Sequence, residues 1–155
     1  MLPAMHKITP FLWYDGKAEE AMKFYTSVFK NSKVINVMPG PNGKASGVTF
    51  ELEGQEFKAL NGGPQFKFSE AVSFFVSCET QAEVDELWEK LSAGGTKQQC
   101  GWLKDKFGLS WQIIPSVLGT MLADKDRTKA NRAMQAMLKM EKIDIAGLEK
   151  AFEQQ

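Results

Sequence analysis

The sequence contains few of the residues that build most metal sites and nucleophilic sites. Its 155 residues include one histidine, His6, and two cysteines, Cys78 and Cys100. A single histidine cannot form a histidine-rich metal site or a Ser–His–Asp triad. Two cysteines do not make a disulfide framework, and so few are typical of a reducing compartment. We therefore expect a cytoplasmic protein.

The chain also lacks a net charge and long apolar runs. Its 19 basic side chains balance its 19 acidic ones, so no general field attracts nucleic acid or an anionic membrane. The apolar runs fall far short of the roughly 20 residues that span a bilayer. The first residues lack the pattern of a signal peptide. We expect no membrane association.

The order of the expected elements repeats along the chain. Residues 8–29 match 72–93 in pattern, and residues 54–60 match 108–114. Each copy reads as a strand, a helix and further strands, although one strand of the second copy is not resolved by the pattern. A unit that cannot cover its own apolar face should pair with its copy. The expected elements are strands at 7–14, 33–38, 46–53, 55–60, 70–78, 98–104 and 109–114, and helices at 17–30 and after the capping box of Thr80 and Glu83.

The last forty residues have no counterpart in the first half. A helix with an Ala/Met stripe is expected at 126–141 with Asp126 as its cap, and Asp144 is expected to cap a last helix. Acidic residues cancel most of the basic excess of this tail, so we expect packing rather than nucleic-acid binding. The basic residues are Lys125, Arg127, Lys129, Arg132, Lys139 and Lys142.

Several motifs give the chain a family resemblance. The segments Asn61-Gly-Gly-Pro64 and Cys100-Gly-Trp-Leu-Lys-Asp-Lys-Phe-Gly-Leu-Ser-Trp-Gln-Ile-Ile-Pro115 resemble those of PhnB-like proteins. So do Arg132-Ala-Met-Gln-Ala-Met and Lys142-Ile-Asp-Ile-Ala in the tail, so that the resemblance spans about 7–152. This branch, some of whose members are labelled 3-demethylubiquinone-9 3-methyltransferase domain, lies in the vicinal oxygen chelate superfamily of glyoxalase I, bleomycin resistance proteins and extradiol dioxygenases.

The resemblance implies an α+β fold. A single domain would hold two βαβββ modules, about 7–61 and 70–115, which form a half-open barrel. C-terminal helices would follow at about 117–153. Superfamily members commonly complete their clefts by pairing, which implies a homodimer.

The resemblance also indicates where a metal would be bound. The last-strand ligand positions fall at Lys58 and Gln112, and those of the first strands at Ile8 or Pro10 and at Val72 or Phe74. Of these residues only Gln112 could bind a metal, and the Lys58 ammonium opposes a cation. A divalent metal needs three or four ligands. We predict no metal and no cofactor. Glu51 and Glu53 could substitute as ligands, but they read more simply as a solvated hairpin edge.

Other chemistries find little support in the sequence. Asn61-Gly-Gly-Pro64 follows a strand but precedes no helix, unlike a nucleotide-binding loop. Cys100, expected on a strand beside Trp102, has no histidine nearby to activate it, and Lys104 would be a weak substitute. No catalytic residue is assigned.

An aromatic-rich cleft with few polar groups has the composition of a small-molecule pocket. The main functional hypothesis is a metal-free small-molecule binding protein. The alternatives are an enzyme of lyase, isomerase or methyltransferase type, and an interaction or DNA-associated module that uses the C-terminal helices. The candidate ligand-binding residues are Lys58, Asn61, Cys100, Trp102 and Gln112.

Overall fold

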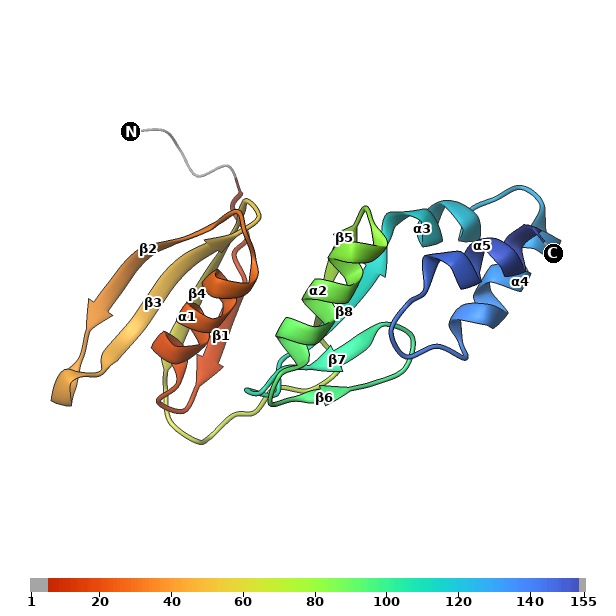
Figure 1. The fold of residues 1–155 in the computed structure, drawn as a ribbon. Helices are drawn as coiled ribbons and strands as arrows, with labels where there is room; N and C mark the ends of the chain where they lie inside the picture. Colours follow the sequence, from red (N-terminus) through yellow and green to blue (C-terminus); the bar gives the residue numbers. More distant parts are fainter. Residues whose placement is uncertain (1–5, 154–155) are drawn as a thin grey trace. The chain divides into compact units, whose positions relative to one another are not determined.

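The computed structural model describes residues 6–153, which form two compact units (Figure 1). Unit 1 runs to Phe68 and unit 2 begins at Ser69. This boundary falls in the segment between the two modules expected from the sequence. Each helix among the described residues is too short or too polar to cross a membrane.

Unit 1 is a four-stranded sheet with one α-helix packed on it. The strands lie in the order β1-β4-β3-β2, with β1 parallel to β4 and the other pairs antiparallel. The elements are β1 (Phe11–Tyr14), α1 (Ala18–Val28), β2 (Ser32–Pro39), a 3-10 turn (Pro41–Gly43), β3 (Ala45–Leu52) and β4 (Gln55–Asn61).

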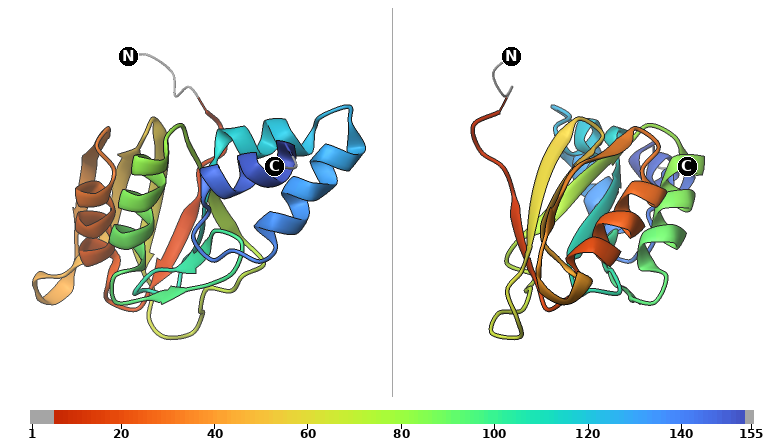
Figure 2. Two further views of the ribbon diagram at one scale, coloured as in Figure 1. Left: turned by 45° about the vertical axis from the view of Figure 1, so that its right-hand side comes forward. Right: turned by 90° about the vertical axis from the view of Figure 1, so that its left-hand side faces the viewer.

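Helix α1 covers one face of this sheet because its apolar stripe and the inward strand residues share one core (Figure 2). Tyr25 stacks on Phe50 with ring centroids 6.1 Å apart, and Phe50 stacks on Phe57 at 5.5 Å. Side chains alternate along β4, so Phe57 and Ala59 are buried while Lys58 between them is exposed. Lys58 therefore lies on the sheet face away from α1.

Unit 2 repeats this arrangement. Its strands lie in the order β5-β8-β7-β6, and β5 is parallel to β8. The duplication and the α+β class predicted from the sequence are confirmed. The elements are β5 (Ser73–Cys78), α2 (Gln81–Ser92), β6 (Thr96–Lys97), β7 (Trp102–Lys104) and β8 (Ser110–Pro115), followed by α3 (Ser116–Leu122), α4 (Arg127–Met137) and α5 (Ile145–Glu153).

Two strand predictions need correction. The first strand begins at Phe11 rather than residue 7. The strand expected at 98–104 is wrong over its first half, because Cys100 and Gly101 adopt φ of 61° and 82°. Such left-handed backbone cannot continue a strand. The strand that the pattern did not resolve is the two-residue β6.

Two of the expected helix caps follow the predicted chemistry, and the cap expected from Asp144 stays a prediction. The Thr80 side chain accepts a hydrogen bond from Glu83 N, and the Glu83 carboxylate accepts one from Glu79 N at 2.8 Å. The Asp126 carboxylate accepts bonds from the second and third residues of its helix, Thr128 N and Lys129 N. Thr80 and Asp126 satisfy backbone donors of the first helical turn, whereas Glu83 bonds the amide of the residue before the cap.

The three C-terminal helices share a small core of their own within unit 2. Ile114 at the end of β8 joins Leu118, Met121, Ala133, Ile143 and Leu148 there. The Arg132 guanidinium donates to Ala151 O at 2.9 Å and to Phe152 O at 2.8 Å, so α4 satisfies carbonyls at the end of α5.

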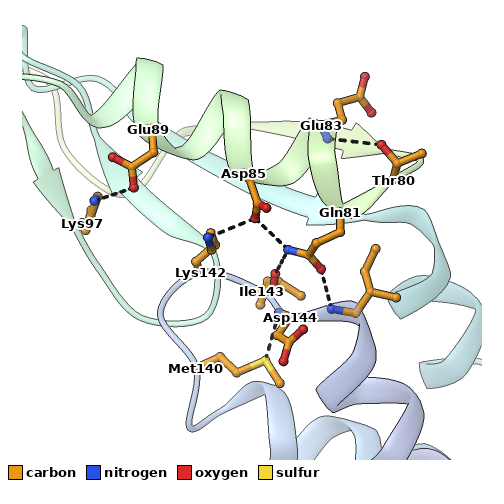
Figure 3. A network of polar contacts seen from close by, with 11 residues as sticks. Thr80, Gln81, Glu83, Asp85, Glu89, Lys97, Met140, Lys142, Ile143 and Asp144 are labelled. Atoms are coloured by element: carbon orange, nitrogen blue, oxygen red, sulfur yellow. Dashed lines mark hydrogen bonds and ion pairs between the residues drawn. The ribbon is translucent and has the colours of Figure 1, made fainter.

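The loop between α4 and α5 is tied to α2 by one amide side chain (Figure 3). Gln81 donates to Ile143 O at 3.0 Å and to Asp85 at 2.9 Å, and its oxygen accepts from Ile145 N at 2.7 Å. Lys142 pairs with Asp85 at 3.0 Å. The bonds from Gln81 and Lys142 hold the pKa of Asp85 below its usual value.

Candidate functional site

The strand register places a phenylalanine beside a polar residue at the same point of both sheets. Phe11 of β1 pairs with Lys58 of β4, and Phe75 of β5 pairs with Gln112 of β8. Residues paired in register present their side chains on one face. Phe11 is 61% exposed and Phe75 is 59% exposed. These pairs mark the sheet faces away from α1 and α2.

The first-strand metal-ligand positions expected from the resemblance therefore differ by an odd number of residues from Phe11 and Phe75, which lie beside Lys58 and Gln112. Phe74 contacts the buried ring of Trp111, with centroids 5.6 Å apart, and Val72 precedes its strand. Ile8 and Pro10 likewise precede β1. A shift of one residue turns every side chain of a strand to the other face. The residues beside Lys58 and Gln112 are Phe11 and Phe75, which have no metal-binding atom.

Lys58 stands on its face as an exposed cation. Its ammonium lies 3.8 Å from Glu56, and both side chains are more than 40% exposed. An exposed pair at that distance contributes little. Lys58 can therefore turn toward an anionic group.

Asn61 is engaged in holding unit 1 together. Its oxygen accepts from Ala18 N at 2.9 Å, and its nitrogen donates to Ala45 O at 2.8 Å. The next residues seat Trp13, whose indole donates to Gly63 O at 2.9 Å and packs where a side chain at Gly62 would lie. These contacts explain the Asn61–Pro64 motif structurally, and a ligand contact by Asn61 stays a prediction.

On the sheet of unit 2, two neighbouring rows of side chains share the face away from α2. The aromatic row holds Phe75, Gln112 and Trp102, which the register aligns across β5, β8 and β7. The structure thus brings together the predicted residues Trp102 and Gln112.

The second row was not predicted and is called the polar row here: Ser73, Ser110 and Lys104, aligned across the same strands. Gln112 donates to the Ser73 hydroxyl at 3.0 Å, which joins the two rows. The sequence could have indicated the polar row, because each of its members lies two residues from a member of the aromatic row. Alternate residues of a strand share a face.

Two members of the polar row have unusual surroundings. The side chain of Ser110 is fully buried, and its hydroxyl has no hydrogen-bond partner among residues 6–153. Lys104 forms an ion pair with Glu70, which lies shortly before β5. The bond from Lys104 holds the pKa of Glu70 below its usual value.

The sequence predicted Cys100 on a strand beside Trp102, and this prediction is wrong. Cys100 lies in a turn before β7. Its amide donates to Met140 O at 2.8 Å, and the Gly101 amide donates to Glu141 O at 2.8 Å. The backbone at this point therefore holds the α4–α5 loop. The other thiol, Cys78, is buried, and burial raises its pKa to about 12.

A buried carboxylate shapes the turn between β7 and β8. Asp105 is 2% exposed and accepts bonds from Phe107 N at 2.9 Å, Leu109 N at 3.1 Å and Trp111 Nε1 at 2.9 Å. The sequence alone gave no sign that Asp105 is buried in this role. The carboxylate fixes the two strands that carry Trp102 and Gln112.

The donor set on these faces suits a divalent metal poorly. No three His, Cys, Asp or Glu side chains in the described part of the chain lie close enough to hold a metal ion. Neutral oxygens of Gln112 and the serines remain, whereas divalent transition metals prefer several N, S or anionic O ligands. A metal-free site stays a prediction.

The C-terminal helices offer a different feature, an open groove of about 460 Å³ lined by Leu122, Arg127, Thr128, Ala130, Asn131 and Met134. Several basic side chains of this region have partners within unit 2. Arg127 donates to Leu122 O and Asp124 O, and Lys129 pairs with Glu153 at 3.7 Å. Lys142 is likewise paired with a carboxylate, that of Asp85, whereas Arg127 and Arg132 keep their charge and have donors engaged by backbone carbonyls.

Comparison with known families agrees with this architecture. The family model described as 3-demethylubiquinone-9 3-methyltransferase matches residues 6–114, from before β1 almost to the end of β8. The match does not include α3, α4 and α5, so the likeness of the tail segments stays a prediction. No curated protein matches the chain.

Solved structures of similar proteins agree with this family and this fold. A PhnB protein of Bacillus cereus is 37% identical with a TM-score of 0.68, and the match covers 72% of this chain and 100% of that one. Protein PA1353 of Pseudomonas aeruginosa is 18% identical at a TM-score of 0.58, covering 68% and 94%. The At5g48480 product of Arabidopsis thaliana is 19% identical at 0.52, covering 71% and 98%. The latter two show the fold alone.

Proposed function

Since the chain belongs to the 3-demethylubiquinone-9 3-methyltransferase family, as its likeness to PhnB-like proteins predicted, we propose that it binds a small molecule without a metal ion. Each unit would offer one face to such a ligand: the face with Phe11 and Lys58 in unit 1, and the face with Phe75 and Gln112 in unit 2. Lys58 and Gln112 would orient the ligand, and the phenylalanines would supply apolar contact.

The observation that carries this proposal is the recurrence of one arrangement in both modules. Each sheet exposes a phenylalanine directly beside a polar residue, at positions related by the internal repeat. Burying an aromatic ring is worth about 1.5–3 kcal/mol, so leaving two of them exposed at equivalent points favours a partner that covers them. Apolar walls with few polar groups are typical of small-molecule sites.

The positions themselves argue for binding without a metal. Phenylalanine supplies no ligand at either first strand, and the Lys58 ammonium repels a cation. Methyl transfer, which the family's name suggests, receives no support from Asn61–Pro64. That segment leads into a loop rather than a helix. Gly62 leaves room for the Trp13 ring, and Gly63 accepts its indole hydrogen bond.

A thermal-shift screen of the full chain tests the proposal. The panel holds bicyclic aromatic alcohols, amides and carboxylates, each with and without EDTA. We expect a member of the panel to raise the melting temperature equally in both conditions, and Phe11→Ala or Phe75→Ala to reduce that rise.

Leu138→Ala is the matched control, because Leu138, directly after α4, is also an exposed apolar side chain, at 50%. It should leave the rise unchanged. A rise that EDTA abolishes would contradict metal-free binding. A rise unaffected by either phenylalanine variant would place the ligand elsewhere.

A further inference from the structure

We propose that the polar row of unit 2 binds the carboxylate group of a flat apolar acid, whose body lies over the aromatic row. This inference rests on the proposed function, since it names the ligand class for the same sheet face. Ser73, Ser110 and Lys104 would contact the carboxylate, and Phe75, Gln112 and Trp102 would contact the body.

The register brings two hydroxyls and an ammonium into one line. Ser73 pairs with Ser110 across β5 and β8, and Ser110 pairs with Lys104 across β8 and β7. Adjacent strands lie about 5 Å apart, so Ser73 and Lys104 lie on either side of Ser110 and about 10 Å from each other in the hydrogen-bonding direction. The Ser110 hydroxyl and the ammonium at the end of the long Lys104 side chain are donors that suit the two oxygens of one carboxylate.

The hydroxyl of Ser110 lacks the partner that a buried donor requires. It lies at the centre of the row, fully buried, with no hydrogen-bond partner in the described part of the chain. A buried polar group left without a partner destabilises a fold. A ligand oxygen would accept this hydrogen bond once the atoms that cover the hydroxyl move aside.

Lys104 already binds a carboxylate, that of Glu70. The side chain of Glu70 is 52% exposed and that of Lys104 is 34% exposed, so solvent screens the pair. The Glu70 carboxylate shows that the ammonium is accessible to an acid. A ligand acid that also reaches Ser110 gains a bond that Glu70 does not make in the structure, and would displace it.

The aromatic row fixes the rest of the ligand. It lies two residues along each strand from the polar row, a distance of about 6.6 Å. A ring system of one or two fused rings bridges that distance. The exposed Phe75 and the half-buried Trp102 offer it apolar surface, and the Gln112 amide between them offers a polar contact.

Isothermal titration of the full chain compares naphthalene-2-carboxylate with its neutral isostere naphthalene-2-carboxamide. We expect the carboxylate to bind about tenfold more tightly, the effect of one charge-assisted hydrogen bond. Lys104→Met and Ser110→Ala should each remove most of that preference. Glu70→Gln should strengthen carboxylate binding, because the competing acid is gone.

The control is Lys97→Met. Lys97 also pairs with a glutamate of α2, Glu89, at 2.8 Å, and its side chain is 42% exposed. The variant should bind as the parent does. Opposite effects of Lys104→Met and Glu70→Gln cannot both come from a general loss of folding.

Equal binding of the two probes would overturn the carboxylate subsite and leave binding on the sheet face standing. So would a loss of preference in Lys97→Met as large as that in Lys104→Met. If neither probe binds, both this inference and its premise fail for flat aromatic ligands.

Discussion

Replacing Asp105 with asparagine should destabilise unit 2 strongly. One carboxylate oxygen accepts from Phe107 N and Leu109 N, and the other accepts from Trp111 Nε1. Asparagine offers one oxygen and one NH2 group. If its oxygen keeps the two backbone amides, its NH2 group faces the indole N–H of Trp111, and two buried donors oppose each other.

The magnitude follows from the bonds lost. A hydrogen bond to a charged group is worth about 1.5–3 kcal/mol, and a buried donor without a partner costs about 1–3 kcal/mol more. Asp105 and Trp111 are both 2% exposed, so water cannot readily take the place of the lost partner. We expect Asp105→Asn to lower the free energy of unfolding by about 3 kcal/mol.

Urea denaturation followed by tryptophan fluorescence measures this change. Asp126→Asn is the matched control, because Asp126 also accepts bonds from two backbone amides but does so at an exposed helix N-cap. Asparagine caps helices about as well as aspartate, so the control should change stability by less than about 0.5 kcal/mol. If the two variants cost the same, the account of Asp105 as a buried three-bond acceptor is wrong.

Three other changes follow from the contacts above. Gln81→Ala should cost about 2–3 kcal/mol, from three bonds worth about 1 kcal/mol each, whereas Gln135→Ala on the exposed side of α4 should cost almost nothing in the same urea assay. Asn61→Ala should cost about 2 kcal/mol, and equal unfolding midpoints for variant and parent would contradict the bonds to Ala18 and Ala45. Burial raises the pKa of Cys78 from 9.0 to about 12, so unfolding releases a proton in this window and stability falls as pH rises through it. Cys78→Ala should show a smaller fall across the same window, and an identical pH profile would refute this.

The sequence predicted the features that depend on local chemistry. Thr80 and Asp126 cap their helices because a short side-chain oxygen next to free amides needs nothing from the rest of the fold. The repeat predicted the element order of both modules, since both copies carry the same apolar pattern. Lys58 and Gln112 lie at the expected points of β4 and β8 for the same reason.

The features that the sequence did not predict depend on distant contacts. Cys100 leaves the strand conformation where its amide, with that of Gly101, bonds to the α4–α5 loop, about forty residues away. The first strand begins at Phe11. The predicted positions Pro10 and Phe74 lie one residue before Phe11 and Phe75, so the prediction named the wrong face of both strands. Ser110 looks like an ordinary strand serine, and only the packed sheet shows that its hydroxyl is buried without a partner.

The most direct test of metal-free ligand binding on the sheet faces is a map of amide shifts. The uniformly 15N-labelled full chain is titrated with naphthalene-2-carboxylate in the presence of EDTA. We predict that the shifts gather on the strands of unit 2 that carry Phe75, Gln112 and Trp102. Shifts that gather on α3 and α4, or that arise only after a divalent metal is added, would contradict the account.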